Sequence, residues 1–175
     1  GPEQRSFLQE MADFEALQGG DKQYCLRRRN PDTAALGYDA PLPVEVPYGQ
    51  PHHLHEISFY IADDLEAQAA RVQRVVLRLN VADLVTADRI TLLLNGESLW
   101  TQRCRRSICT PLDPYMGQWL EFDLVDVRPR RGRNLLALSL DGRPPELECA
   151  VRLDDVELRI EYGPYPASGP AQRQR

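Results

Sequence analysis

Apolar and polar residues alternate with a period of two along most of this chain, from Gln23 to Tyr162. Such alternation is typical of β-strands that bury one face and expose the other. The alternating runs lie at residues 57–61, 75–81, 90–94, 120–124, 136–140 and 156–162, with shorter candidates at 23–28 and 41–46. The pattern therefore predicts about eight strands and a mostly β protein.

Turn residues separate these runs. Asn95-Gly96 is a strong signal for a tight hairpin, and Arg131-Gly132, Asp141-Gly142 and Pro144-Pro145 also indicate turns. Asp154-Asp155 interrupts the last alternating run, which predicts a β-bulge there. Because no helical periodicity falls between the strands, we expect an antiparallel β-sandwich of the jelly-roll type.

The N-terminal part has a different pattern. Residues 6–18 place apolar side chains at helical spacing, and Gly19-Gly20 follows, so we expect one amphipathic helix. Gly1-Pro2 resembles the scar of a cleaved tag, and residues 1–22 could form a junction to an upstream domain. The sandwich domain is then predicted at 23–162, with a disordered tail at 163–175.

Composition and charge narrow the range of partners. The 175 residues, 42% of them hydrophobic, suit a single globular domain. A net charge of -5 argues against a nucleic-acid partner, and the lack of a long apolar run argues against a membrane partner. The four cysteines favour free thiols, although Cys104 and Cys109 could form a bridge across a short loop.

Three segments resemble a known superfamily. The run G-Q-W-L-E-F-D-L (117–124), followed by R-G-R-N-L-L-A-L-S-L (131–140), resembles paired strands of galactose-binding-like jelly rolls. The hairpin I-T-L-L-L-N-G-E-S-L (90–99) resembles an element of the sugar-binding sandwiches attached to glycoside hydrolases, and the likeness spans about 55–162. This resemblance implies an accessory domain of a larger enzyme, with a glycan ligand or the parent's catalytic domain as partner.

Candidate catalytic and metal-binding residues are few. His52, His53 and His55 are the only histidines, and a zinc site would need a further ligand supplied by the fold. No nucleophile elbow or phosphate-binding loop is present in the sequence, so we predict no enzymatic activity and no cofactor. A structural calcium ion is an alternative, with Asp63, Asp64 or Asp154 as its ligands.

The segment from Thr101 to Gly117 is predicted to be the longest irregular connection between two strands, and long loops on a rigid sandwich often bind ligands. Aromatic rings beside charged groups suit a sugar, because CH groups pack on the ring while hydroxyls bind the charges. Trp119 could equally well belong to the core. The candidate ligand-binding residues are Arg105, Asp113, Tyr115, Trp119, Tyr48 and His52.

Two functions remain open at this point. The first is a non-catalytic, carbohydrate-binding accessory module of a glycoside hydrolase-type protein. The alternative is a structural domain that braces a neighbouring catalytic domain without binding glycan.

Overall fold

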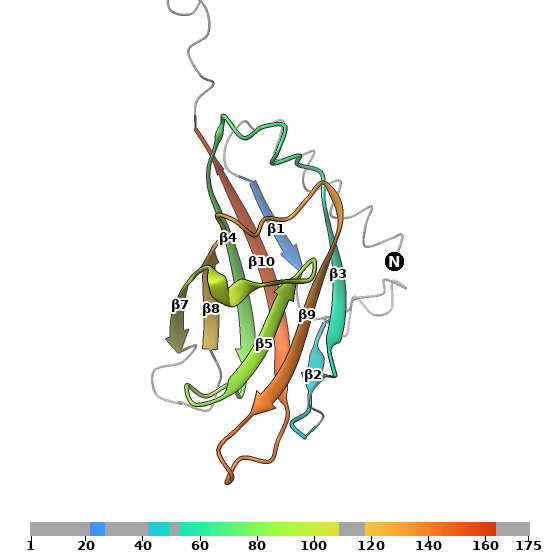
Figure 1. Cartoon of the computed structure of the whole chain (residues 1–175), viewed down its shortest axis with the longest axis vertical. Helices are drawn as coiled ribbons and strands as arrows, with labels where there is room; N and C mark the ends of the chain where they lie inside the picture. The colour runs from blue at the N-terminus through green and yellow to red at the C-terminus, as the bar shows by residue number, and fades with distance from the viewer. Residues whose placement is uncertain (1–21, 27–41, 50–52, 109–117, 164–175) are drawn as a thin grey trace, which may run out of the picture.

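The computed structural model of the chain describes residues 22–26, 42–49, 53–108 and 118–163. These residues form two antiparallel sheets that pack face to face, which confirms the predicted β-sandwich (Figure 1). The predicted helix at 6–18 and the tail from 164 lie outside the described residues. No described helix has the length and apolar character needed to cross a membrane.

The described strands number ten, six in one sheet and four in the other. The six-stranded sheet has the order β1-β10-β4-β8-β7, with β2 also paired to β10, and the four-stranded sheet has the order β3-β9-β5-β6. The strand bounds are β1 Lys22–Leu26, β2 Val44–Val46, β3 His55–Ile61, β4 Val72–Ala82, β5 Arg89–Leu94, β6 Glu97–Ser98, β7 Arg103–Ile108, β8 Gln118–Asp123, β9 Gly132–Gly142 and β10 Val151–Tyr162. One turn of 3-10 helix, η1 (Leu99–Thr101), follows β6.

The chain changes sheets repeatedly. It passes from β3 to β4 in the opposite sheet, back to β5 and β6, across again to β7 and β8, then to β9 and finally to β10. Strands that are distant in sequence therefore become neighbours, and β4 with β10 forms the long central pair of the six-stranded sheet (Figure 1).

The core lies between the two sheets and is made by the inward residue of each alternating pair. Its fully buried members come from β4, β5, β8, β9 and β10, and include Leu77, Leu79, Leu92, Leu94, Leu120, Phe122, Leu136, Leu138 and Leu153. Burial of one such side chain stabilises a fold by about 1.5–3 kcal/mol. The opposite residues of the same strands are left to form the two outer faces.

Two local predictions are confirmed. Asn95 and Gly96 have φ angles of 51° and 85°, which is the pair of positive values that a type I′ hairpin turn requires. The pairing of β10 with β4 shifts register between Leu153 and Asp155, so the predicted bulge at Asp154-Asp155 is present. The bulge returns Val156 to the core face after Asp154.

Two other predictions are wrong. The segment 101–117 was expected to be irregular, yet residues 103–108 form β7 along the edge of the six-stranded sheet. An edge strand can carry polar residues on both faces, so Arg103, Arg105 and Arg106 hide its alternation. Asp141 and Gly142 were expected to turn, but both belong to β9, and the turn follows at Pro144, whose carbonyl accepts from the Leu147 amide at 2.9 Å.

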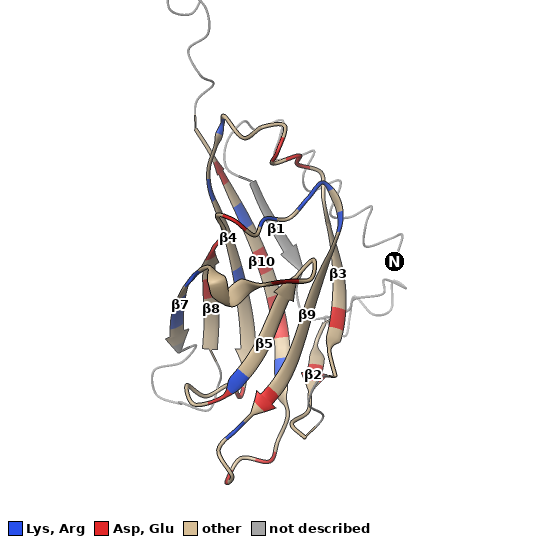
Figure 2. Ribbon diagram, viewed as in Figure 1, with Lys and Arg blue, Asp and Glu red and all other residues tan. Residues whose placement is uncertain are grey.

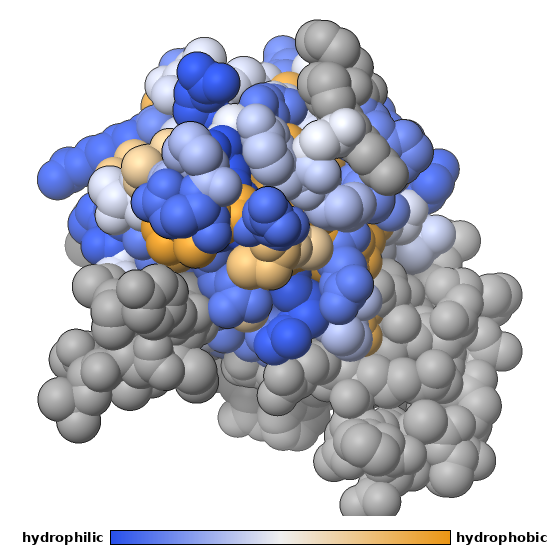
Figure 3. Space-filling view, turned by 90° about the horizontal axis from the view of Figure 1, so that it is seen from below, coloured by the Kyte–Doolittle hydropathy of each residue, from blue (hydrophilic) through white to orange (hydrophobic). Residues whose placement is uncertain are grey.

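The end of the sandwich that Figure 3 shows is mostly polar over the described residues. Figure 3 views the molecule from below, and apolar side chains reach this surface only in small groups between hydrophilic ones. Over the described residues, this end therefore presents no wide apolar patch of the kind that marks many protein interfaces.

Candidate binding site

The outer face of the six-stranded sheet is rich in charge of both signs. Because side chains alternate along each strand, the residues opposite the core on β4, β7, β8 and β10 all point to this face. Figure 2 shows basic positions along β4 and both acidic and basic positions along β10. The charged residues of these four strands on this face are Arg74, Arg78, Arg103, Arg105, Arg152, Arg159, Glu121, Asp123, Asp154, Asp155, Glu157 and Glu161.

Arg78 is the centre of this face. In the sheet register it stands opposite Glu121 on one side and Glu157 on the other. Its Nη1 atom donates to Glu157 Oε2 at 2.7 Å, and its Nε atom lies 3.3 Å from Glu121 Oε2. The Glu157 side chain is only 7% exposed, whereas the Arg78 side chain is 36% exposed, so the carboxylate is largely removed from water while the guanidinium group still reaches it. Three strands hold the geometry of this group.

Arg74 forms the second cluster, four residues before Arg78 on the same strand and beyond Val76. Its Nε and Nη2 atoms both donate to Asp123 Oδ1, at 3.1 and 2.8 Å, and its Nη1 atom donates to Glu161 Oε2 at 3.4 Å. The hydrogen bonds that Arg74 donates to Asp123 raise the pKa of Arg74. These bonds hold the guanidinium group of Arg74 on the outer face.

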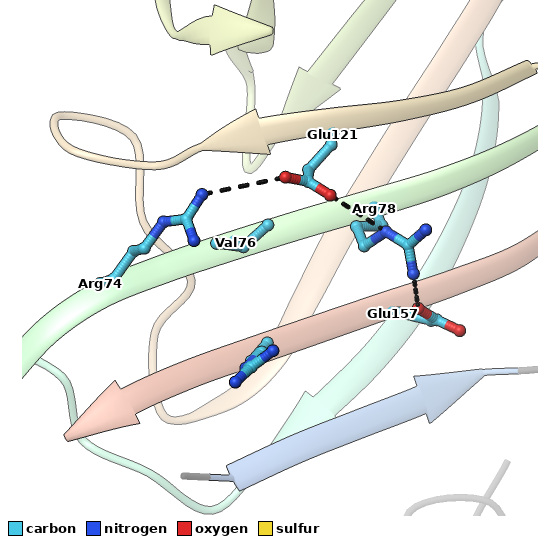
Figure 4. A pocket seen from close by; sticks show the side chains of 6 residues that line it. Arg74, Val76, Arg78, Glu121 and Glu157 are labelled. Carbon is cyan, nitrogen blue, oxygen red and sulfur yellow. Dashed lines mark hydrogen bonds and ion pairs between the residues drawn. The ribbon is translucent and has the colours of Figure 1, made fainter. Parts of the chain in front are cut away.

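A cavity of about 310 Å³ opens between these clusters (Figure 4). Its volume falls at the lower end of the range of about 300–1,000 Å³ that is usual for small-molecule sites. Among the described residues that line it, Val76 is the one apolar residue, and it is 4% exposed. The lining residues are Arg74, Val76, Arg78, Glu121, Glu157 and Arg159.

Trp119 borders this cavity through Arg78. It lies on β8, in register with Asn80 on β4 and Ser107 on β7, so it faces outward rather than into the core. The Cζ atom of Arg78 lies 4.3 Å from the centroid of the Trp119 ring, a cation–π contact. The sequence left open whether Trp119 belongs to the core, and the structure places it on the outer face of the sheet.

Arg105 belongs to the same face. From β7 it donates through Nε to Glu121 Oε1 at 3.1 Å, and its Nη2 atom contacts the same oxygen. The structure therefore brings together two of the residues chosen from the sequence, Arg105 and Trp119, although both come from strands rather than from a loop.

The other chosen residues are not placed on this face. Tyr48 follows β2, forms an isolated backbone bridge with Leu140 of the four-stranded sheet, and does not line the cavity. Its side chain is exposed. His52, Asp113 and Tyr115 lie outside the described residues, as does Cys109, while Cys104 carries a free thiol.

The histidines and the calcium candidates have other contacts. The rings of His53 and His55 meet edge to face at 4.7 Å between centroids, and burial together with the charge of His53 lowers the pKa of His55. Asp63 accepts a hydrogen bond from the Tyr162 hydroxyl, and Asp64 Oδ1 accepts from the Ala67 amide at 3.0 Å.

The side chain of Asp154, the third candidate calcium ligand, also accepts hydrogen bonds from a neighbouring residue. Its two carboxylate oxygens accept from Arg152 at 2.6 and 3.1 Å. Within the described ranges, no three His, Cys, Asp or Glu side chains gather closely enough to hold a metal ion.

Sequence reasoning missed all six described lining residues of the cavity, Arg74, Val76, Arg78, Glu121, Glu157 and Arg159. Each occupies the outward position of an alternating run, so the signal was present in the pattern R-x-V-x-R of β4 and E-x-D of β8. What the pattern lacks is the register that places β8 and β10 on the two sides of β4. In comparisons with known proteins, no family model and no curated protein matches the chain.

Proposed function

We propose that this chain is a non-catalytic accessory module that binds carbohydrate on the outer face of its six-stranded sheet, within a larger glycoside hydrolase-type protein. The proposed ligand site is the cavity around Arg78, bordered by Trp119 and Arg105. In this proposal the domain is a jelly roll related to the galactose-binding-like superfamily.

The strand order supports the jelly-roll part of the proposal. In a jelly roll, two Greek keys wrap so that the chain alternates between two sheets of a sandwich. The orders β1-β10-β4-β8 and β3-β9-β5-β6 have this alternation, and β7 adds one strand at the edge. The resemblance of residues 90–99, 117–124 and 131–140 to sugar-binding sandwiches points the same way.

One observation carries the ligand part: donors, acceptors and an aromatic ring share one continuous, concave face. Sugar hydroxyls both donate and accept hydrogen bonds, so they need guanidinium donors and carboxylate acceptors close together. Arg78 and Glu121 provide both within 3.3 Å of each other, and Trp119 adds a flat apolar surface beside them. Strands hold these groups, so little ordering entropy is lost on binding.

The same geometry supports a binding role rather than catalysis. A glycosidase needs one carboxyl group that donates a proton to the leaving oxygen. Glu121 and Glu157, the two carboxylates in the cavity, each form an ion pair with Arg78. Acceptors held in this way suit hydrogen bonding to hydroxyls.

Affinity electrophoresis through gels that contain soluble polysaccharides tests the proposal. We expect the wild-type chain to be retarded by at least one glycan. Trp119→Ala should weaken that binding by about 1–3 kcal/mol, because a stacking surface is lost. Tyr48→Ala is the matched control: it removes an exposed aromatic ring that does not line the cavity, and it should leave retardation unchanged.

The bracing role remains the competing function, and one observation favours it. Most arginines and carboxylates of the face already form ion pairs with one another, as they would on a purely structural face. If no glycan retards the chain while a separately produced catalytic domain of the parent protein binds it tightly, the carbohydrate proposal is wrong and the bracing role is right.

A further inference from the structure

We infer that the cavity selects uncharged, hydroxyl-rich glycans over acidic or sulfated ones. This inference rests on the proposed function and deepens it by naming the ligand class. It follows from the balance of charge on the face, from the hydrogen-bonding capacity left at Arg78, and from the positions of the two carboxylates in the cavity.

The charges on the outer face of β4, β7, β8 and β10 cancel. Six arginines on β4, β7 and β10 stand against six carboxylates on β8 and β10, so their formal sum is zero. The whole chain carries a net charge of -5. Recognition of an anionic polymer depends on cations in excess, which attract it over several ångströms and release its counterions. This face offers no such excess.

Arg78 retains a donor for a neutral group. Its Nη1 atom is used by Glu157 and its Nε atom faces Glu121, whereas its Nη2 atom forms no hydrogen bond with any described residue. A ligand hydroxyl can accept from Nη2 and donate its own hydrogen to a neighbouring carboxylate oxygen. Two neighbouring neutral hydroxyls of a sugar could each accept one hydrogen bond and donate another without breaking an ion pair.

A carboxylate or sulfate group of a ligand would bind less tightly than a hydroxyl at the same point. Three arginines and two carboxylates line the described cavity, but Arg74 already donates to Asp123 and Glu161, and Arg78 to Glu157. An anion would therefore meet paired cations, and it would also approach the carboxylates of Glu121 and Glu157. The negative charge of the ligand would repel the two carboxylates of the cavity. An ionised ligand group also has no hydrogen to donate to the oxygens of Glu121 and Glu157. The geometry thus works against an anion while it accommodates a hydroxyl (Figure 4).

The experiment compares two panels in affinity gels at about 20 and 300 mM NaCl, a range over which screening changes strongly. Neutral probes are a galactan, a mannan, a xylan and a mixed-linkage β-glucan; acidic probes are polygalacturonate, alginate and heparin. We expect retardation by a neutral probe, with an affinity that changes less than about twofold with salt, since no net charge is neutralised.

Two variants locate the effect, and thermal melting checks that both fold. Arg78→Lys keeps the charge beside Glu157 but removes the planar fork, so it should weaken neutral binding about tenfold. Arg133→Lys is the matched control, because Arg133 is also a cross-strand arginine but lies on the four-stranded sheet, bonded to Ser58. It should leave the affinity unchanged.

The outcomes distinguish a failure of this inference from a failure of the proposed function. Stronger retardation by an acidic probe, lost at high salt, overturns the inference and leaves carbohydrate binding in place. Neutral binding that Arg78→Lys leaves intact overturns the inference as well, because the selecting residue would lie elsewhere. Retardation by no probe at all overturns both the inference and the proposed function.

Discussion

The side-chain amide of Asn95 donates a hydrogen bond of 3.0 Å to Oδ1 of Asn134, a residue with no exposed surface. Asn134 Oδ1 also accepts from the Arg130 amide at 2.8 Å, while its Nδ2 atom donates to the carbonyls of Arg130 and Gly132. Asn95 in turn accepts from the Leu135 amide at 2.8 Å. Two turns that are far apart in the sequence are thus joined by two amide side chains.

Replacing Asn134 with alanine should lower the free energy of unfolding by about 2–4 kcal/mol, since buried backbone groups lose their partners. Urea unfolding followed by circular dichroism measures the loss. Glu97→Ala, an exposed change beside the same hairpin, is the control and should stay within about 0.5 kcal/mol of wild type. A loss below about 1 kcal/mol for Asn134→Ala would show that water replaces these bonds.

The role of Asn134 bears on how much the sequence could predict. The strand G-R-N-L-L-A-L contributed to the family resemblance, and the structure shows a packing reason for its asparagine: the residue closes two turns. Alternation predicted the core, and Asn95-Gly96 predicted its hairpin, because both depend on neighbouring residues alone.

The binding face could not be predicted in the same way. Arg78 and Glu157 are 79 residues apart in the chain, and their pairing depends on register between strands that local pattern does not specify. The edge strand β7 was missed for a related reason, since its polar outer residues find their partners only on β8. Long-range pairing had to come from the structure.

A second stability prediction concerns Arg143 and Asp88, whose side chains are both fully buried. Arg143 donates to both Asp88 oxygens, at 3.0 and 2.9 Å, and to the carbonyls of Asp83 and Cys149, each at 2.5 Å. Arg143→Met should therefore cost about 3–5 kcal/mol in denaturant unfolding, because it leaves a buried carboxylate without its cation.

The control for this pair is Arg105→Met, which breaks an ion pair with Glu121 whose side chains are 47% and 27% exposed, and which should cost about 1 kcal/mol or less. The double change Arg143→Met with Asp88→Leu should cost clearly less than the two single changes added together. Additive losses would mean that the two side chains are not energetically coupled.

The pH dependence of stability provides a third prediction, at Tyr162. Burial, and then the hydrogen bond to Asp63, raise the pKa of the Tyr162 hydroxyl in the folded state. Below the unfolded value of about 10, both states are protonated and the full stabilisation is present. Above it the unfolded chain ionises first, so the stabilisation is lost progressively as pH rises.

Urea unfolding of wild type and Tyr162→Phe at pH 8, 9, 10 and 11 tests this sign. The stability advantage of wild type should hold constant up to about pH 9 and then shrink. Tyr48→Phe, at an exposed ring, corrects for general alkaline effects. An advantage that persists undiminished at pH 11 would contradict the assigned hydrogen bond.

The last prediction uses the two tryptophans as reporters of where a glycan binds. Trp119 lies on the outer face of β8 against Arg78, a residue of the cavity, whereas Trp100 contacts the core residue Phe122 edge to face at 5.3 Å and donates to the Ile90 carbonyl at 2.7 Å. A ligand in the cavity should change the surroundings of Trp119 and leave those of Trp100 as they are.

Titration with a neutral oligosaccharide that binds should therefore change the fluorescence of wild type and of Trp100→Phe, and leave the fluorescence of Trp119→Phe nearly constant. If the signal instead survives in Trp119→Phe and vanishes in Trp100→Phe, the ligand sits near η1, and the outer face of the six-stranded sheet is not the binding site.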